Sequence, residues 1–117
     1  LGGTLYQDLK TQTDTEITHN MDKPYDRTVH EVNILPDTPL AALYRPGPLA
    51  VNSRHHQGIK GLAPALRAQA VASDGLIEAV YLPEYRFVQA VQWHPEHRWQ
   101  AAESQSLLRS FVDACRG

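Results

Sequence analysis

The segment Arg86-Phe87-Val88-Gln89-Ala90-Val91-Gln92-Trp93-His94-Pro95-Glu96 runs from an apolar stretch straight into a short polar triplet. Apolar side chains at both odd and even positions of 86–93 predict a strand that is buried on both faces, which is typical of sheets covered by helices. In α/β proteins, ligand sites lie beyond the carboxyl ends of such strands. We therefore expect an α/β fold with a site at His94-Pro95-Glu96.

The triplet has a defined local geometry, because proline fixes its own φ and favours an extended conformation in the residue before it. Residues two apart in an extended chain point to the same side. Glu96 can then accept a hydrogen bond from one imidazole nitrogen of His94, which leaves the other nitrogen free to act on a nucleophile. A surface His–Glu pair without a task is the alternative, and the triplet alone leaves it open.

The rest of the chain reads as short elements separated by proline and glycine turns. A polar segment, 10–28, predicts a surface excursion. Before this segment we expect a helix over 5–9 capped by Thr4. After it we expect strands over 29–35 and 49–53, with a helix from Pro39 to Tyr44 between them. A hairpin of 66–72 and 76–82 should turn at Asp74-Gly75, and an amphipathic helix over 100–115 should close the chain.

The composition is that of one globular domain, with 117 residues, 42% hydrophobic residues and a net charge of −2. The near-neutral charge argues against nucleic acid as a partner, and no apolar stretch is long enough to span a membrane. The single cysteine, Cys115, excludes an internal disulfide and fits a reducing compartment, so we expect a cytoplasmic protein. Its place on the apolar stripe of the closing helix predicts a core cysteine.

Several other residues have two interpretations. A zinc site formed by His55, His56, His94 and His97 lacks the usual ligand spacing, so the sequence predicts no metal site. Glu78 is expected on a solvated strand face. Trp93 and Trp99 are expected to pack against the core.

Taken together, several blocks resemble a known family. The segment 87–96 is similar to the signature of class I glutamine amidotransferase-like enzymes. The block Val51-Asn52-Ser53-Arg54-His55-His56-Gln57-Gly58-Ile59 resembles the γ-glutamyl-γ-aminobutyrate hydrolase branch, peptidase C26. Segments 2–9, 62–64 and 74–80 also fit that branch and occur in the same order.

The resemblance implies a flavodoxin-like α/β domain with a Cys-His-Glu triad, of which this chain resembles the C-terminal portion, with a β-meander and a closing helix. His94 would be the base and Glu96 its orienting carboxylate. His55, His56 and Gln57 would line or support the substrate site, although one of the two histidines could instead be a hydrogen-bonded core residue. No metal or organic cofactor is implied.

The nucleophilic cysteine of the family lies on a strand-to-helix elbow. The terminal Cys115-Arg116-Gly117 repeats that elbow tripeptide, but a helix precedes it, so we do not assign it as the nucleophile. The chain opens on Leu1-Gly2-Gly3, and we expect the nucleophile to lie upstream, with the N-terminal half of the same protein docked onto this chain.

Three functions follow from the resemblance. The first is hydrolysis of a small γ-glutamyl amide, such as γ-glutamyl-γ-aminobutyrate in polyamine breakdown. The second is a glutaminase domain that passes ammonia to a partner, and the third is a non-catalytic binding domain of the same fold. The sequence leaves self-association into a homo-oligomer open.

Overall fold

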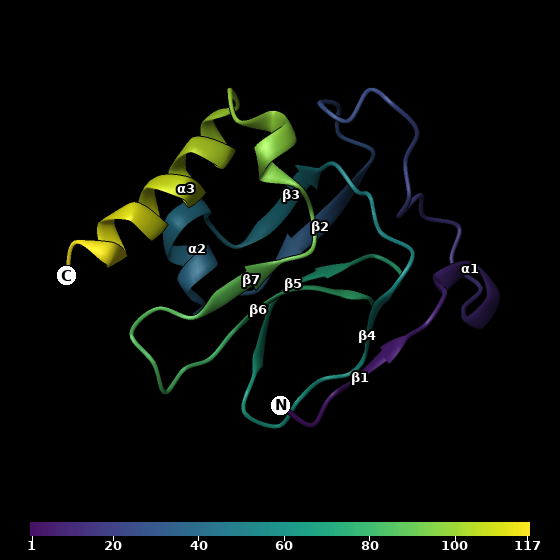
Figure 1. Cartoon of the computed structure of the whole chain (residues 1–117), viewed down its shortest axis with the longest axis horizontal. Coiled ribbons are helices and arrows are strands. Elements are labelled where there is room, and N and C mark those ends of the chain that lie inside the picture. The colour runs from purple at the N-terminus through teal and green to yellow at the C-terminus, as the bar shows by residue number, and fades with distance from the viewer.

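The computed structural model describes all 117 residues and has a mixed α/β architecture (Figure 1). Its main sheet has five strands in the order β3-β2-β5-β6-β7, with every neighbouring pair antiparallel. These strands are β2 (His30–Ile34), β3 (Gly47–Val51), β5 (Arg67–Ala72), β6 (Ile77–Tyr81) and β7 (Gln89–Val91).

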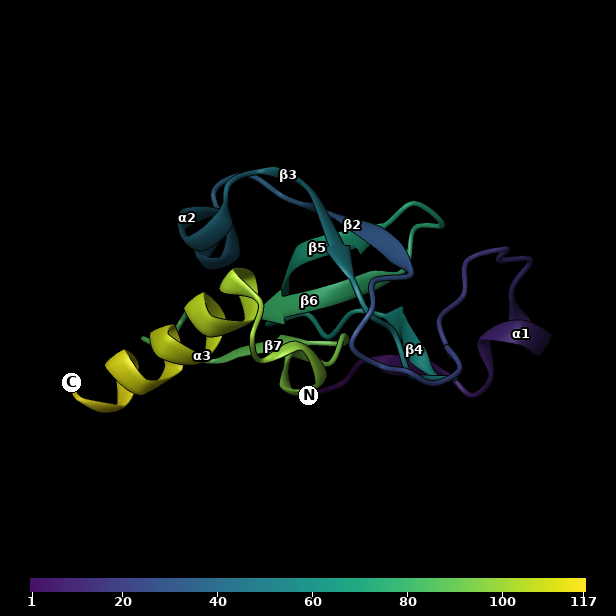
Figure 2. The same cartoon turned by 90° about the horizontal axis from the view of Figure 1, so that it is seen from above.

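A second sheet pairs β1 (Thr4–Tyr6) with β4 (Gly58–Gly61). The helical elements are α1 (Leu9–Gln12), α2 (Pro39–Tyr44), the 3-10 turn η1 (Pro95–Arg98) and α3 (Ala102–Cys115). Figures 1 and 2 place α2 and α3 at one end of the main sheet and α1 at the other.

The core lies where β2, β5 and β6 carry apolar side chains on one face. Val32 is paired with Ala72 and Ile34 with Ala70, so their buried side chains lie side by side across two strands. The buried apolar cluster consists of Leu9, Val32, Ile34, Leu40, Val51, Ala70, Ala72, Leu76, Ala79 and Trp93. Because these residues come from most of the chain, packing of this cluster fixes the positions of the loops that carry polar side chains.

The predicted strand near 29–35, the hairpin and the helix from Pro39 to Tyr44 are confirmed. At the hairpin, Gly75 adopts φ 88°, which the turn requires. The helix starts as expected, because Thr38 accepts a hydrogen bond from the Ala41 N–H and Pro39 occupies the first turn.

The predicted helix over 5–9 is wrong. Residues Thr4–Tyr6 form a strand that pairs with β4, an element that the sequence did not indicate. The helix begins at Leu9 instead, because the side chain of Asp8 accepts a hydrogen bond from the Thr11 N–H.

The segment 10–28 is not simply a surface excursion. His19 and Met21 are buried, with 4% of each residue exposed. The Ser53 hydroxyl donates to the carbonyl of His19, and the Met21 N–H donates to the carbonyl of Ser53. These bonds tie the segment to the end of β3, which gives its backbone partners that a polar composition does not reveal.

The expected strand 86–93 is much shorter than predicted. Only Gln89–Val91 form β7, and Val88 remains 44% exposed. Because β7 is the outer strand of its sheet, it pairs with β6 alone. Trp93, just beyond it, is buried as expected.

The closing helix is confirmed, but its last turns pack less tightly than predicted. Leu107 packs against the core, whereas Leu108, Phe111 and Val112 are exposed. Cys115 is also exposed, because the end of α3 extends away from the sheet (Figures 1 and 2), so the core-cysteine prediction is wrong. Trp99, at 57% exposure, does not close the core either. None of the helices combines the length and the apolar character needed to cross a membrane.

Candidate functional site

His94 and Glu96 lie together directly after the buried Trp93. The Nδ1 atom of His94 lies 2.7 Å from Oε1 of Glu96, so a proton on Nδ1 is donated to the carboxylate. The His94 side chain is 32% exposed and that of Glu96 is 59% exposed. The imidazole is therefore oriented by an acid and remains accessible from solvent.

The pair forms by a different route from the one predicted. Pro95 opens the 3-10 turn η1, so Glu96 lies in a turn and not in extended chain. His94 itself precedes the turn with φ −118° and ψ 80°, and its carbonyl accepts a hydrogen bond from the His97 N–H. The turn brings the Glu96 carboxylate close to the His94 ring. The two side chains therefore pair as predicted, although the predicted extended conformation of this segment is wrong.

The second ring nitrogen of His94 faces a backbone oxygen. Its Nε2 atom lies 3.2 Å from the carbonyl oxygen of Arg54, in the loop that follows β3. When Nε2 carries a proton, this carbonyl can accept it in a hydrogen bond. The imidazolium form of His94 thus has an acceptor at each nitrogen, and the neutral form can leave Nε2 for another group.

Asn52 fixes the backbone of His94. Its Oδ1 accepts a hydrogen bond from the His94 N–H at 2.9 Å, and its Nδ2 donates to the His94 carbonyl, also at 2.9 Å. The same Nδ2 donates to the carbonyl of Tyr25 at 2.9 Å. Asn52 is 1% exposed, so one buried amide holds the catalytic candidate and the loop 22–28 together.

The pKa of Glu96 is held below its ordinary value. Burial raises it, but the hydrogen bond from His94 and the positive charges that His94 and His97 can carry outweigh that effect. Glu96 therefore stays ionised near neutral pH, as an orienting carboxylate requires.

The predicted substrate residues do not form one group. His56 is exposed, and its Nδ1 lies 3.9 Å from Oδ1 of Asp8, while the Gln57 side chain donates to the carbonyl of Gln7. The side chain of His55 is only 7% exposed and points into the interior. The structure thus favours the alternative left open above, in which one of the two histidines is a core residue.

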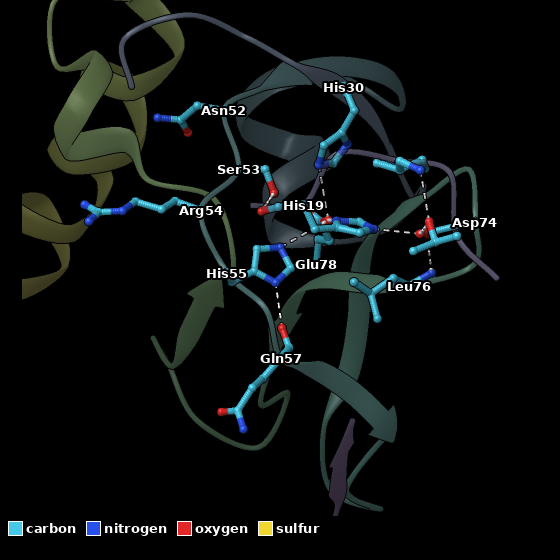
Figure 3. A network of polar contacts seen from close by, with 12 residues as sticks. His19, His30, Asn52, Ser53, Arg54, His55, Gln57, Asp74, Leu76 and Glu78 are labelled. Atoms are coloured by element: carbon cyan, nitrogen blue, oxygen red, sulfur yellow. Dashed lines mark hydrogen bonds and ion pairs between the residues drawn. The ribbon is translucent and has the colours of Figure 1, made fainter. Parts of the chain in front are cut away.

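The interior that receives His55 holds a polar cluster that the sequence did not predict (Figure 3). We call the set His19, His30, His55 and Glu78 the buried histidine cluster. Glu78 is 1% exposed, so its expected place on a solvated strand face is wrong. Its carboxylate is enclosed by the side chains of His19, His30 and His55, and His19 belongs to segment 10–28.

No pattern in the sequence marks this cluster, because its members are 11 to 59 residues apart and follow no ligand spacing. A strand over 76–82 does place Glu78 on one face with Leu76 and Val80. Both neighbours are apolar, which was the available signal that Glu78 faces inward, and both are buried in the structure.

Charges within this region shift two pKa values. Burial raises the pKa of Asp74, but hydrogen bonds from Thr15, His19 and the Leu76 backbone outweigh burial and hold it below the ordinary range. Burial raises the pKa of Glu78 as well, and the surrounding histidines outweigh that effect. Both carboxylates are therefore anionic in the folded protein.

Comparison with known proteins gives the family. The family model described as Peptidase C26 matches residues 1–96. The chain is 46% identical over 115 residues to Protein NtpR of Enterococcus hirae, covering 96% of this chain and 48% of that protein. It is 45% identical over 69 residues to the gamma-glutamyl-gamma-aminobutyrate hydrolase PuuD of Escherichia coli, covering 56% of this chain and 26% of that protein.

Solved structures agree on the fold. A putative GMP synthase component from Thermoplasma acidophilum superimposes with a TM-score of 0.64 at 18% identity, over 98% of this chain and 49% of that one. The glutaminase domain of Trypanosoma brucei CTP synthase, with bound acivicin, superimposes with a TM-score of 0.55 at 19% identity, over 86% and 47% of the two chains. The chain spans about half the length of these two proteins and of Protein NtpR. The chain has the class I glutamine amidotransferase fold, and it belongs to the peptidase C26 family.

Proposed function

We propose that this chain supplies His94 and Glu96 to a Cys-His-Glu hydrolase that cleaves γ-glutamyl amide bonds. The observation that carries the proposal is the 2.7 Å contact between Nδ1 of His94 and Oε1 of Glu96. That contact sets the tautomer of a half-exposed imidazole and leaves Nε2 for proton transfer.

In the proposed reaction, Nε2 of His94 takes the proton of a cysteine thiol, and the thiolate attacks the γ-carbonyl carbon of the substrate. The C–N bond then breaks, and His94 gives its proton to the departing amine. Water, deprotonated by His94, attacks the resulting thioester and releases glutamate and the thiol. Glu96 keeps the ring aligned and stabilises its charged form throughout.

The cysteine must come from a segment other than the one that carries His94. Cys115 lies at the far end of α3 from η1, and a helix of 14 residues is about 21 Å long. We propose that the N-terminal part of a longer protein supplies the nucleophile and its oxyanion donors, and that His56 and Gln57 lie near the substrate.

A γ-glutamyl amine as substrate is supported by the similarity to the gamma-glutamyl-gamma-aminobutyrate hydrolase PuuD. A glutaminase that delivers ammonia to a partner is the second candidate, because the two solved structures above are, by name, a GMP synthase component and a glutaminase domain. The two candidates share the same triad and differ in the amine that leaves.

The experiment uses the protein in which this chain is joined to a cysteine-bearing N-terminal segment. Release of γ-aminobutyrate from γ-glutamyl-γ-aminobutyrate and of ammonia from glutamine would be measured side by side. A faster first reaction supports the hydrolase, whereas ammonia release that rises when a synthetase partner is added supports the glutaminase. If the wild-type protein shows neither activity, both proposals are refuted, and a non-catalytic binding domain is the function that remains.

A further inference from the structure

The buried histidine cluster brings four side chains from separate segments to one point. His19 comes from segment 10–28, His30 from β2, His55 from the loop after β3 and Glu78 from β6. Their inward atoms converge on Oε1 of Glu78, at 3.1 Å for His19 Nδ1, 3.4 Å for His30 Nε2 and 3.8 Å for His55 Nε2. Figure 3 shows the three rings pointing toward this carboxylate.

The outer nitrogen of each ring faces an oxygen that can only accept a hydrogen bond. His19 Nε2 lies 2.6 Å from Oδ2 of Asp74, and His55 Nδ1 lies 2.6 Å from the carbonyl of Gln57. His30 Nδ1 lies 3.1 Å from the carbonyl of its neighbour Glu31. Each outer nitrogen therefore carries the ring proton, and in a neutral imidazole the inner nitrogen then presents a lone pair.

The inner atoms have no hydrogen-bond partners. The inner nitrogens of the three rings and both carboxylate oxygens of Glu78 are buried and unpaired in the folded chain. His19 Nδ1 is close to Glu78 but not in line for a hydrogen bond. Leaving so many buried polar atoms unpaired is costly in a protein interior.

A metal cation would give three of these side chains, His19, His55 and Glu78, a common partner. We propose that His19 Nδ1, His55 Nε2 and a Glu78 oxygen bind a divalent transition-metal ion, with Zn²⁺ the best match. Two ligands about 2.1 Å from a tetrahedral ion are about 3.4 Å apart, and the inward distances to Glu78 are 3.1–3.8 Å. The three ligand atoms all lie within 4.8 Å of one another.

His30 Nε2 lies 3.4 Å from the same carboxylate oxygen, but it is outside the set of ligand atoms that lie within 4.8 Å of one another, so its ring would have to move inward to become a fourth ligand. Nitrogen and carboxylate ligands with no thiolate suit zinc and similar ions. The acceptors behind each ring, a carboxylate and two carbonyls, are the outer partners that metal-bound histidines usually have. A divalent ion also balances the charges of Glu78 and Asp74.

The proposed site is structural, because its ligand atoms are closed to solvent, whereas catalytic zinc keeps an open position. Its role would be to hold the loop after β3. In that loop, His55 binds inward while the carbonyl of the preceding Arg54 faces His94 at 3.2 Å. The ion would thus fix the position of an acceptor at the proposed active site.

Zn²⁺ and Co²⁺ would be added to metal-free purified protein, with binding measured by mass spectrometry of metal content, by calorimetry and by the Co²⁺ absorption spectrum. We expect one ion per chain, a tetrahedral Co²⁺ spectrum and a Tm raised by at least about 5 °C at saturating Zn²⁺. Mg²⁺ should not reproduce the shift, because it prefers oxygen ligands. Wild-type protein that binds neither ion overturns the proposal.

Variants locate the ion. His55→Ala and Glu78→Gln should weaken binding by at least about 100-fold, and Asp74→Asn by about 10–100-fold. The matched control, His56→Ala, removes an exposed neighbouring imidazole and should retain full binding.

A second group, His94, Glu96 and His97, also places its ligand atoms within 4.8 Å of one another, but it is partly exposed. Loss of binding in Glu96→Gln or His97→Ala would assign the ion there and refute the proposal. If Glu78→Gln does not fold, Glu96→Gln, His97→Ala and the X-ray absorption spectrum of the wild-type metal complex still test the proposal. Retained binding in these two variants, together with at least two imidazole ligands in the spectrum, supports the buried site. Any other result refutes it.

Discussion

The His94–Glu96 pair and the buried histidine cluster use the same two residue types in opposite surroundings. In the pair, the ring is 32% exposed and each nitrogen has an acceptor within hydrogen-bonding distance. In the cluster, Glu78 is fully buried and the inner ring nitrogens have no partner. Access to water decides what the same chemistry can do, since an accessible imidazole can exchange protons and a closed set of lone pairs can hold a cation.

The strongest test of this contrast concerns catalysis. His94→Ala in the protein that carries the nucleophile should lower kcat/KM by about 10²–10⁴-fold, because proton transfer to and from the leaving group is lost. The folded structure should be unchanged, because the side chain is 32% exposed and its two polar partners are the exposed Glu96 carboxylate and a loop carbonyl. Steady-state rates on γ-glutamyl-γ-aminobutyrate, with circular dichroism as a check on folding, would measure this.

His97→Ala is the comparison variant, since it removes an imidazole of the same turn that acts on Glu96 only through its charge, and its loss of rate should be much smaller. An equal loss of rate in both variants would show that the turn matters as a whole, and that His94 has no special role.

The next largest effect is expected on stability. Glu78→Gln should lower the free energy of unfolding by about 3–5 kcal/mol, as expected when one partner of a buried charged group is removed. Chemical denaturation in the presence of Zn²⁺ would measure it. Glu84→Gln, at an exposed carboxylate in the β6–β7 turn, should change stability by no more than about 0.5 kcal/mol. Similar losses of stability in Glu78→Gln and Glu84→Gln would contradict the difference between the buried cluster and an exposed carboxylate.

A smaller effect should show whether Asn52 positions His94 for catalysis or only contributes to packing. Asn52→Ala leaves partly buried backbone groups of His94 and Tyr25 without these partners and should cost about 1–3 kcal/mol of stability. It should also lower kcat more than it changes KM, because the ring of His94 loses its fixed place. Asn33→Ala, at an exposed position of β2, serves as the control, and an unchanged kcat in Asn52→Ala would exclude a positioning role.

The smallest effect concerns the acid range. The folded pKa of Glu96 lies below its value of 4.5 in the unfolded chain, so its contribution to stability is present above pH 4.5 and disappears as the pH falls through the folded value. An NMR titration of the Glu96 carboxyl carbon should show a midpoint below 4.5. In His94→Ala the midpoint should move up toward 4.5, and a midpoint that does not move would mean that His94 does not stabilise the carboxylate.

Local sequence rules predicted the elements whose signals lie within a few residues. Thr38 and Pro39 mark the start of α2, and Asp74-Gly75 marks the hairpin, because capping and turn geometry depend on immediate neighbours. The contact between His94 and Glu96 was predicted for the same reason, although the backbone reaches it through a 3-10 turn.

The features that were missed depend on contacts between distant segments. His19 and Met21 are buried because they pair with the end of β3, more than 30 residues away. Glu78 is buried because histidines from three other segments surround it. Strand β1 exists only because β4 lies beside it. Hydrophobic periodicity carries no information about such pairings.

In the loop after β3, successive side chains point in opposite directions. Ser53 and His55 face the interior, while the side chains of Arg54 and His56 face outward. Inward and outward positions can therefore change independently. A laboratory library that randomises only 54, 56 and 57 should leave the fold intact, whereas one that includes 53 and 55 should lose most of its members to misfolding.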